Sequence, residues 1–324
     1  MIKNPLLEKY WNEKVSTLAT LNAVSIPDPL KERHRLYSLC LMAITHHYWN
    51  GLKKGRDGEY PWNPDPATAG GKYLRDDYRG HNIAAFAVDK RGLVIDFEFN
   101  HNRLLNSSAE HAEARLVRRI YGLTQINDAW DVASPSAPAT DDYNTFEEVT
   151  LYTTLESCSQ CSGVMALARV REVIFLQTDP GMYMIGNILR NLTEKTALES
   201  PLPVPGSMFD FSFFTELDTA FEGFTKEVMT KPFYKSPAGK VDNSPSVTSF
   251  LCTALAYDIY ARAAKALNDL ADGTTQLLFP DAKPVDRAGK EVTNGLTNAE
   301  TLKEVLGFRD YAVQKGRRAT PHGG

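Results

Sequence analysis

Two short motifs bring together residue types that bind metal ions and move protons. Cys158 and Cys161 are separated by two residues, and they are half of the four cysteines in the chain. Upstream, His111 and Glu113 are separated by a single residue. Imidazole and thiolate groups are preferred ligands of Zn²⁺, and a carboxylate beside such a site can carry protons during hydrolysis.

The cysteine pair has two interpretations. Both residues lie where a predicted strand is followed by a predicted helix, and a helix N-terminus favours thiolates. Residues three apart on a helix share a face, so both sulfurs can approach one object. This arrangement fits a pair of zinc ligands or a redox-active dithiol. A dithiol needs no further ligand, whereas a catalytic zinc site needs a third donor and one open position.

His111 is the candidate for that third donor. A His-x-Glu motif alone is weak, but together with Cys-x-x-Cys on the next predicted helix it is much more specific. Histidine and two cysteines on Zn²⁺, with a glutamate that is not a ligand, are the signature of zinc-dependent base deaminases. Cys40 and Cys252 lie on apolar helix faces and are expected to serve packing.

Hydrophobic periodicity predicts the elements that carry these motifs. The predicted order is a hairpin, a helix, a strand, a helix and a strand. The ranges are 83–88 and 93–99, 111–121 with Gly122 as its end, 149–154, a helix from Ser157, and 172–177. A strand–helix–strand unit of this kind predicts a mixed sheet covered by helices.

The rest of the chain reads as loops and helices. A polar stretch at 53–80 is expected to be an insertion and 128–144 a surface loop. Arg115, Arg118 and Arg119 are expected to form a solvated helix face, with a contact to a phosphate group as the alternative. Further helices are predicted at 36–47, 215–229, 247–270 and 299–314.

Several pieces of the chain resemble the cytidine-deaminase-like superfamily, in particular its tRNA-adenosine, guanine and CMP/dCMP deaminase branch. The matching residues are 108–114, 150–165, 168–175 and 178–181. One difference is Ser157, which stands where the family usually has proline. The resemblance implies an α/β fold with three layers, α/β/α, and a mixed central sheet, followed by a largely helical C-terminal extension. The expected domains are an N-terminal extension (1–30), a zinc-dependent deaminase core (31–190) and the extension packed on it (191–324).

The resemblance also implies roles for particular residues. His111, Cys158 and Cys161 would hold Zn²⁺, and Glu113 would be the general acid and base. Substrate-binding residues are expected to be Asn100, the backbone of Ala112, Asp179 and Phe209. Each of three has an alternative: Asn100 as a turn cap, Asp179 as a turn or cap residue, and Phe209, with Phe211, Phe213 and Phe214, as core.

Composition narrows the partners. The chain has 36 Lys and Arg against 40 Asp and Glu, so its formal net charge is −4. This charge favours a free base, nucleoside or nucleotide over a nucleic acid as the substrate. The resemblance to the purine-acting branch favours a purine. No stretch approaches the roughly 20 apolar residues of a membrane span. A cytoplasmic soluble enzyme is expected, and the family resemblance implies a homodimer or larger homo-oligomer. The alternatives are a deaminase of bases within tRNA or single-stranded nucleic acid, and an inert zinc-stabilised protein that binds partners.

Overall fold

The computed structural model describes most of the chain, in nine segments. These are residues 13–20, 25–49, 80–102, 104–132, 146–194, 199–230, 234–235, 241–242 and 245–315. The predicted insertion, up to residue 79, and residues 133–144 of the predicted surface loop lie outside the described residues.

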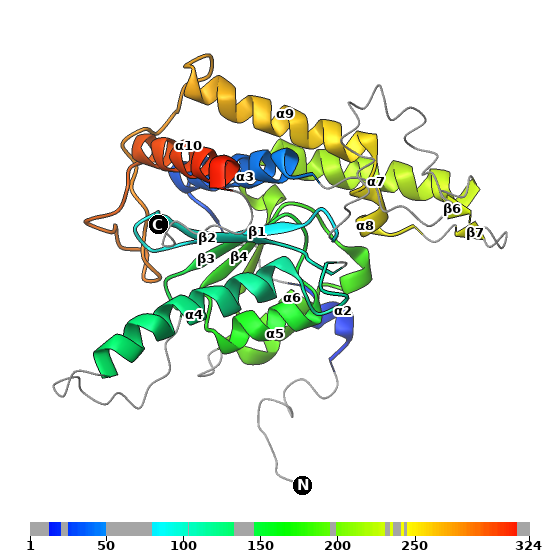
Figure 1. Ribbon diagram of the computed structural model, residues 1–324, viewed down its shortest axis with the longest axis horizontal. Helices are drawn as coiled ribbons and strands as arrows, with labels where there is room; N and C mark the ends of the chain where they lie inside the picture. The colour runs from blue at the N-terminus through cyan, green and yellow to red at the C-terminus, as the bar shows by residue number, and fades with distance from the viewer. Residues whose placement is uncertain are drawn as a thin grey trace, which may run out of the picture.

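A five-stranded mixed sheet forms the middle layer (Figure 1). The strands are β1 (Ala84–Val88), β2 (Val94–Phe99), β3 (Thr150–Thr153), β4 (Glu172–Phe175) and β5 (Leu202–Pro205). Their order across the sheet is β2-β1-β3-β4-β5. β1 is antiparallel to both β2 and β3, whereas β4 is parallel to β3 and β5 is parallel to β4. The predicted hairpin and the strand–helix–strand unit are both confirmed.

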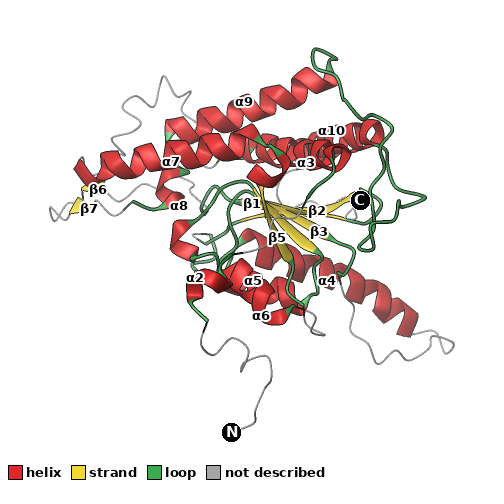
Figure 2. Cartoon of the chain, turned by 180° about the vertical axis from the view of Figure 1, so that it is seen from behind, coloured by secondary structure: helices red, strands yellow, loops and turns green. Residues whose placement is uncertain are grey.

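Helices cover both faces of this sheet (Figure 2). One layer contains α4 (Ala112–Val132), α5 (Ser159–Leu167) and α6 (Ile185–Thr193). The other contains α3 (Asp28–His47), α7 (Ser212–Thr230), α9 (Ala254–Ala271) and α10 (Asn298–Lys315). Short elements complete the described fold: α2 (Val15–Leu18), α8 (Val247–Phe250), the 3₁₀ turns η1 (Pro180–Met182) and η2 (Gly206–Phe209), and the hairpin β6 (Tyr234–Lys235) and β7 (Val241–Asp242). The predicted three-layer α/β/α fold with a helical C-terminal region is confirmed.

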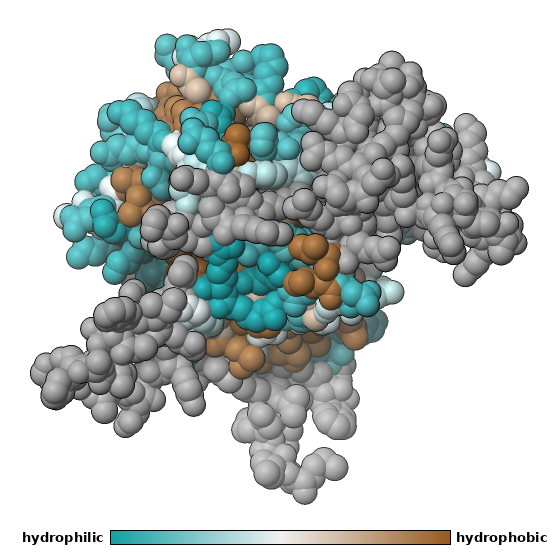
Figure 3. Space-filling model, viewed as in Figure 1, coloured by the Kyte–Doolittle hydropathy of each residue, from teal (hydrophilic) through white to brown (hydrophobic). Residues whose placement is uncertain are grey.

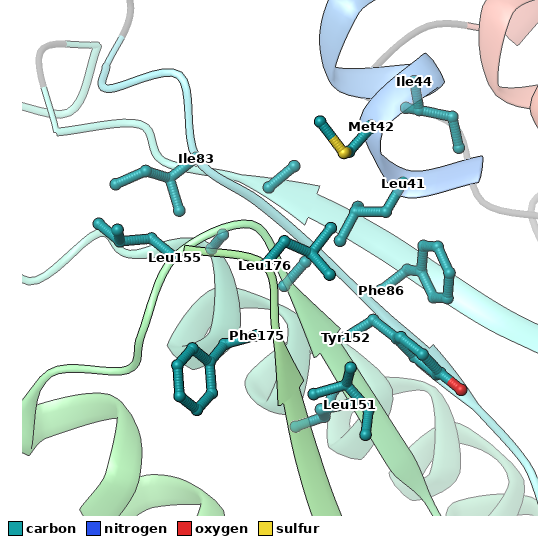
Figure 4. Close-up of a cluster of buried hydrophobic side chains, with 14 of the residues drawn as sticks. Leu41, Met42, Ile44, Ile83, Phe86, Leu151, Tyr152, Leu155, Phe175 and Leu176 are labelled. Atoms are coloured by element: carbon teal, nitrogen blue, oxygen red, sulfur yellow. The ribbon is translucent and has the colours of Figure 1, made fainter. Parts of the chain in front are cut away.

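Strand β3 connects the core to the site because successive side chains of a strand point to opposite faces. Tyr152 points toward α3. Its ring lies 5.1 Å from that of Tyr37 in α3 and 5.2 Å from that of Phe86 in the neighbouring strand β1. Figure 4 shows Leu41 of α3 on the same side of the sheet. The next residue, Thr153, points toward α4 and reaches Glu113. The buried aromatic cluster on one face therefore fixes the strand that supports the candidate site on the other.

Helix α4 does not end at Gly122, as the sequence predicted, but continues to Val132. A glycine inside a helix costs about 1 kcal/mol relative to alanine, which is too little to end a helix that is otherwise well packed. Leu116 and Val117 of this helix are buried against the sheet. Gly122 is therefore compatible with the interior of a helix.

The predicted helix 247–270 is two helices. Residues 251–253 separate α8 from α9, and Thr253 is the N-cap of α9, with its Oγ1 accepting a hydrogen bond from the backbone N–H of Ala256. The same hydroxyl donates to the carbonyl of Phe250 at 2.7 Å. Local hydrogen bonds of this kind compete with helix continuation.

Strand β5 and helix α6 were not predicted. Prolines lack the backbone N–H that a sheet needs, so 201–205 reads as a loop. The strand is nevertheless possible because β5 is at the edge of the sheet, where only its side facing β4 is paired.

Buried hydrogen bonds join the C-terminal region to α3. Arg33 donates from Nη1 to Thr301 Oγ1 at 2.7 Å, and from Nη2 to the carbonyls of Ala282 and Leu296 at 2.9 and 2.6 Å. Glu32 accepts the backbone N–H groups of Leu278 and Phe279. Residues far apart in the sequence thus form one helical layer.

The coloured surface in Figure 3 is mainly hydrophilic over the layer of α9 and α10, with smaller hydrophobic patches between. Within the described part of the chain, no helix combines the length and the apolar character needed to cross a bilayer.

Candidate metal centre

His111, Cys158 and Cys161 come together at one end of the sheet. His111 immediately precedes α4, Cys158 is the N-cap of α5, and Cys161 lies in the first turn of α5. Their donor atoms all lie within 4.8 Å of one another, with His111 Nδ1 3.3 Å from Cys158 Sγ and 3.7 Å from Cys161 Sγ. A tetrahedral Zn²⁺ with ordinary bond lengths places a nitrogen and a sulfur ligand about 3.6 Å apart. One imidazole and two sulfurs at these distances fit Zn²⁺.

The surroundings of the two cysteines shift the pKa values of their thiols in opposite directions. A hydrogen bond from Cys161 and the contact with His111 hold the pKa of Cys158 below that of an ordinary thiol. The same shared hydrogen bond and burial raise the pKa of Cys161. Cys158 is therefore the first of the two to become a thiolate, and the α5 N-terminus favours that charge.

Glu113 lies beside the three donors and is 3% exposed. Its Oε1 accepts hydrogen bonds from Thr153 Oγ1 at 3.2 Å and from Ser157 Oγ at 3.1 Å. Its Oε2 lies 3.4 Å from Cys161 Sγ. Burial raises the pKa of this carboxyl group. Ser157, the residue that replaces the usual family proline, thus supplies a hydroxyl group that orients Glu113.

A pocket of about 130 Å³ opens onto these residues. It is lined by His81, Ile83, Asn100, His111, Glu113, Leu155, Glu156, Cys158, Asp179, Met182 and Thr248. Two of the four residues expected to bind substrate, Asn100 and Asp179, are among them.

Asn100 follows β2 and is 2% exposed. Its Oδ1 accepts the backbone N–H of Ala112 at 2.7 Å, which satisfies an N–H of the first turn of α4. Asn100 thus holds the start of a helix across a loop, which is not the local turn cap named as its alternative. Ala112 is fully buried, and its N–H is already used by Asn100.

Asp179 lies after β4, where it caps η1 by accepting the backbone N–H of Gly181 at 2.9 Å. Burial raises the pKa of Asp179. The backbone N–H of Asp179 donates to Glu156 Oε2 at 3.0 Å, and burial raises the pKa of Glu156 to about 7. Two carboxyl groups thus lie side by side on one wall of the pocket.

Phe209 does not line this pocket. Its side chain is fully buried, and its ring lies 5.5 Å from that of His34 and 5.8 Å from that of Phe211. It belongs to the core, which was the alternative for this aromatic segment.

Sequence reasoning missed several lining residues. His81 and Ile83 lie at the start of β1, beside the end of β2, because the hairpin pairs Ala84 with Phe99. The strand pairing of the predicted hairpin could therefore have placed His81 and Ile83 beside Asn100. Thr248 belongs to α8, and no local pattern placed α8 at the pocket.

The comparison with protein families identifies one known region. The profile of the cytidine and deoxycytidylate deaminase zinc-binding region matches residues 67–177. This range includes His111, Glu113, Cys158 and Cys161. No curated protein sequence matches the chain.

Solved structures with partial similarity include several deaminases. A structure from studies of A-to-I editing by tRNA:A34 deaminases is 23% identical, with the match covering 44% of this chain and 92% of that chain, at a TM-score of 0.30. Guanine deaminase from Bacillus subtilis is 20% identical over 37% of this chain and 59% of that chain, at 0.24. Guanine deaminase from Nitrosomonas europaea is 18% identical over 59% and 91%, at 0.27. These TM-scores are too low to support a functional argument, and the profile matches residues 67–177, about a third of the chain.

Proposed function

We propose that this chain is a zinc-dependent hydrolytic deaminase of the cytidine-deaminase-like superfamily, which the match of the deaminase zinc-binding profile to residues 67–177 supports. Its substrate is an exocyclic amine of a free nucleobase or nucleoside, with a purine favoured. The observation that supports this most directly is the convergence of His111, Cys158 and Cys161 beside the buried carboxyl group of Glu113.

His111, Cys158 and Cys161 would hold Zn²⁺, which would lower the pKa of a water molecule and make it a nucleophile at neutral pH. Glu113 is the proton carrier. Its Oε1 is held by two hydroxyl groups, and its Oε2 faces the ligand Cys161. It would accept a proton from the attacking water and deliver it to the ring nitrogen beside the attacked carbon; it would then take the second proton, from the hydroxyl group added to that carbon, and give it to the departing amine. The oxygen of water becomes the new carbonyl oxygen, and ammonia leaves.

Asn100 and Asp179 are proposed to contact the substrate. The Oδ1 of Asn100 is used by Ala112, so its amide N–H₂ is the group available to donate to a base or ribose. Asp179 keeps Oδ2 as an acceptor for a ring N–H, and Glu156 lies beside it. The role of Ala112 is to orient Asn100.

The charge of the pocket favours an uncharged substrate. Its described lining residues include the carboxyl groups of Glu113, Glu156 and Asp179, but neither lysine nor arginine. A phosphate group would meet no guanidinium or ammonium partner among them, and nucleic-acid binding depends on such partners. This supports a base or nucleoside over a nucleotide or a polymer.

Two further expectations remain proposals. Four free cysteines, three of them buried, are consistent with a reducing compartment such as the cytoplasm. Assembly into a homodimer or larger homo-oligomer is proposed from the family resemblance.

The test is ammonia release from a panel of free purine and pyrimidine bases, nucleosides and nucleotides, with tRNA and single-stranded DNA as polymer substrates. We expect turnover of a free purine or its nucleoside, its loss after chelation of the metal, and its recovery when Zn²⁺ is restored. Turnover only on tRNA or DNA would replace the proposed substrate class. A zinc-loaded protein that releases ammonia from none of them would favour the inert, partner-binding alternative.

A further inference from the structure

A second and larger pocket lies at the opposite end of the parallel strands. Its volume is about 550 Å³, within the range of small-molecule sites. Thr150, Glu172 and Leu202, the first residues of β3, β4 and β5, line it, whereas Cys158 follows the other end of β3. The two pockets share none of their described lining residues.

Four arginines from different segments converge on this second pocket: Arg33, Arg171, Arg190 and Arg287. Arg33 donates only to neutral oxygens and, among the described residues, forms no ion pair. Arg171 donates to the carbonyls of Val285 and Asp286 at 2.8 and 3.3 Å, and its nearest carboxylate contact is Glu172 at 3.9 Å. Neutral oxygens satisfy N–H groups but leave the guanidinium charge uncompensated.

The other two arginines share one carboxylate. Arg190 Nη2 lies 3.0 Å from Glu199 Oε1, and Arg287 Nη2 lies 2.9 Å from Glu199 Oε2. Two positive charges therefore meet a single negative one. Lys90, in the hairpin turn, adds a further cation at the rim.

The carboxylates of this pocket are mostly used by the chain itself. Asp89 Oδ1 accepts two backbone N–H groups of the hairpin turn, and Asp286 Oδ1 accepts those of Ala288 and Lys290. Glu172 accepts the hydroxyl of Thr150 at 2.7 Å. Asp89, Asp286 and Glu172 hold turns and strand ends, and the closest described contact of these three with a pocket arginine is that of Glu172 with Arg171 at 3.9 Å. Glu148 is a fourth carboxylate in the lining, and no ion pair between it and these arginines is described.

Two buried polar atoms of residues that line this pocket, Arg33 Nε and Glu148 Oε2, have no hydrogen-bond partner among the described residues. Arg33 is 5% exposed, and its Nε is buried without a hydrogen-bond partner among the described residues. A buried donor without a partner is costly, and such groups in native structures call for a ligand or an ordered water. Arg33 lines the pocket, so an occupant can supply the acceptor.

The remaining wall is suited to a flat, apolar body. His34, Tyr37 and Tyr152 provide rings, and Leu30, Leu202 and Val204 provide aliphatic surface. Arginine forks recognise phosphate groups with two parallel hydrogen bonds. We propose that this pocket is a second ligand site, which binds a small aromatic molecule that carries a phosphate group, with the phosphate at the arginines and the ring against this wall.

The test uses the zinc-loaded, full-length protein and isothermal titration with three probes. These are 4-methylumbelliferyl phosphate, its dephosphorylated form 4-methylumbelliferone, and inorganic phosphate. The variants are Arg287→Gln, whose side chain is 41% exposed and whose only described ion pair is with Glu199, and Lys90→Gln on the hairpin turn. Arg262→Gln is the matched control, because Arg262 is an exposed arginine paired with one carboxylate, Glu216, away from the pocket. Thermal unfolding without ligand verifies that each variant is folded.

We expect 4-methylumbelliferyl phosphate to bind to one site per chain. 4-Methylumbelliferone alone and inorganic phosphate alone should each bind more weakly. Arg287→Gln should raise the dissociation constant by about tenfold, the size of one lost charge-assisted hydrogen bond. Lys90→Gln should raise it in the same direction, and Arg262→Gln should leave it unchanged. Absence of saturable binding to the wild type, or equal binding by wild type and both pocket variants, overturns the proposal. Equal binding would also indicate that the probe occupies the zinc pocket instead.

Discussion

Asn100 illustrates how one side chain can have two roles at this site. The fold uses its Oδ1 to cap α4, which fixes the helix that begins one residue after His111 and contains Glu113. Its amide N–H₂ group has a different role, because it is the group proposed to donate a hydrogen bond to the substrate. The two roles depend on different atoms, so they can be separated by substitution.

Asn100→Ala removes both atoms, and Asn100→Asp keeps the acceptor while removing the donor. We expect Asn100→Ala to lose about 1 kcal/mol of the free energy of unfolding, as for other lost caps, together with activity. Asn100→Asp should keep the hydrogen bond to the N–H of Ala112 but lose at least tenfold in kcat/KM, because its carboxylate cannot donate to the substrate. Denaturant unfolding and steady-state kinetics measure the two effects. If Asn100→Asp keeps full activity, Asn100 is only a cap.

Strand β2 and helix α4 are joined by charges as well as by packing. Arg119 Nε lies 2.7 Å from Asp96 Oδ2, and Arg119 Nη1 lies 2.8 Å from Glu98 Oε1. Arg115 Nε lies 3.3 Å from Glu98 Oε2. The expectation that Arg115 and Arg119 form a solvated face is therefore wrong for these two residues. They are one turn apart on α4, and their partners are two apart on β2, so each pair shares a face.

This network predicts a pH effect on stability. Burial raises the pKa of Asp96 from 3.8 to about 6. The folded protein thus holds this proton more tightly than the unfolded chain, so the contribution of Asp96 to the free energy of unfolding falls as pH rises between these values. Asn cannot ionise. The stability of Asp96→Asn relative to wild type should therefore increase from about pH 4 to about pH 6, by up to about 3 kcal/mol.

Denaturant unfolding of wild type and Asp96→Asn at several pH values checks this prediction. The absolute offset between the two proteins includes the lost contact with Arg119, so the trend is the informative quantity. A difference that does not change with pH would mean that Asp96 ionises in the folded protein as it does in the unfolded chain.

The whole molecule depends on contacts between segments far apart in the sequence. β5 completes the sheet from beyond residue 190, Arg33 binds the carbonyls of Ala282 and Leu296, and Thr248 lines the zinc pocket. Asn82 donates from Nδ2 to the carbonyl of Leu251 at 2.9 Å. These contacts cross the predicted boundary between residues 31–190 and 191–324. Whether residues 31–190 fold without the rest of the chain can therefore be tested.

We expect a fragment of residues 31–190 to lack a cooperative unfolding transition. Removing the rest deletes β5 and uncovers the α3 surface that packs against α9 and α10, where Cys40 and Ile44 are fully buried. Calorimetry of this fragment, beside residues 25–315 as control, tests the expectation. A fragment that unfolds cooperatively and retains zinc would show that 31–190 is an independent domain.

The parts of the protein that could be predicted are those with local signals. The spacing of Cys158 and Cys161, the His-x-Glu motif and the alternation of 83–99 each depend on a few neighbouring residues, and all lie where the sequence placed them. Thr248 and β5 could not be predicted because their places depend on tertiary packing. Gly122 shows that a single glycine is a weak stop signal, since α4 continues past it to Val132.

The central claim is that Glu113 moves protons beside a zinc ion that it does not bind. The most direct measurement is the zinc content and the ammonia release of Glu113→Gln, determined on the same preparation and compared with wild type. Gln keeps the shape and the acceptor for Thr153 and Ser157 but cannot carry a proton. We predict one zinc per chain in both proteins and a 10²- to 10⁴-fold lower turnover in the variant, as for a lost general acid and base. Near-wild-type turnover in the zinc-loaded variant, or loss of zinc from it, would contradict this account.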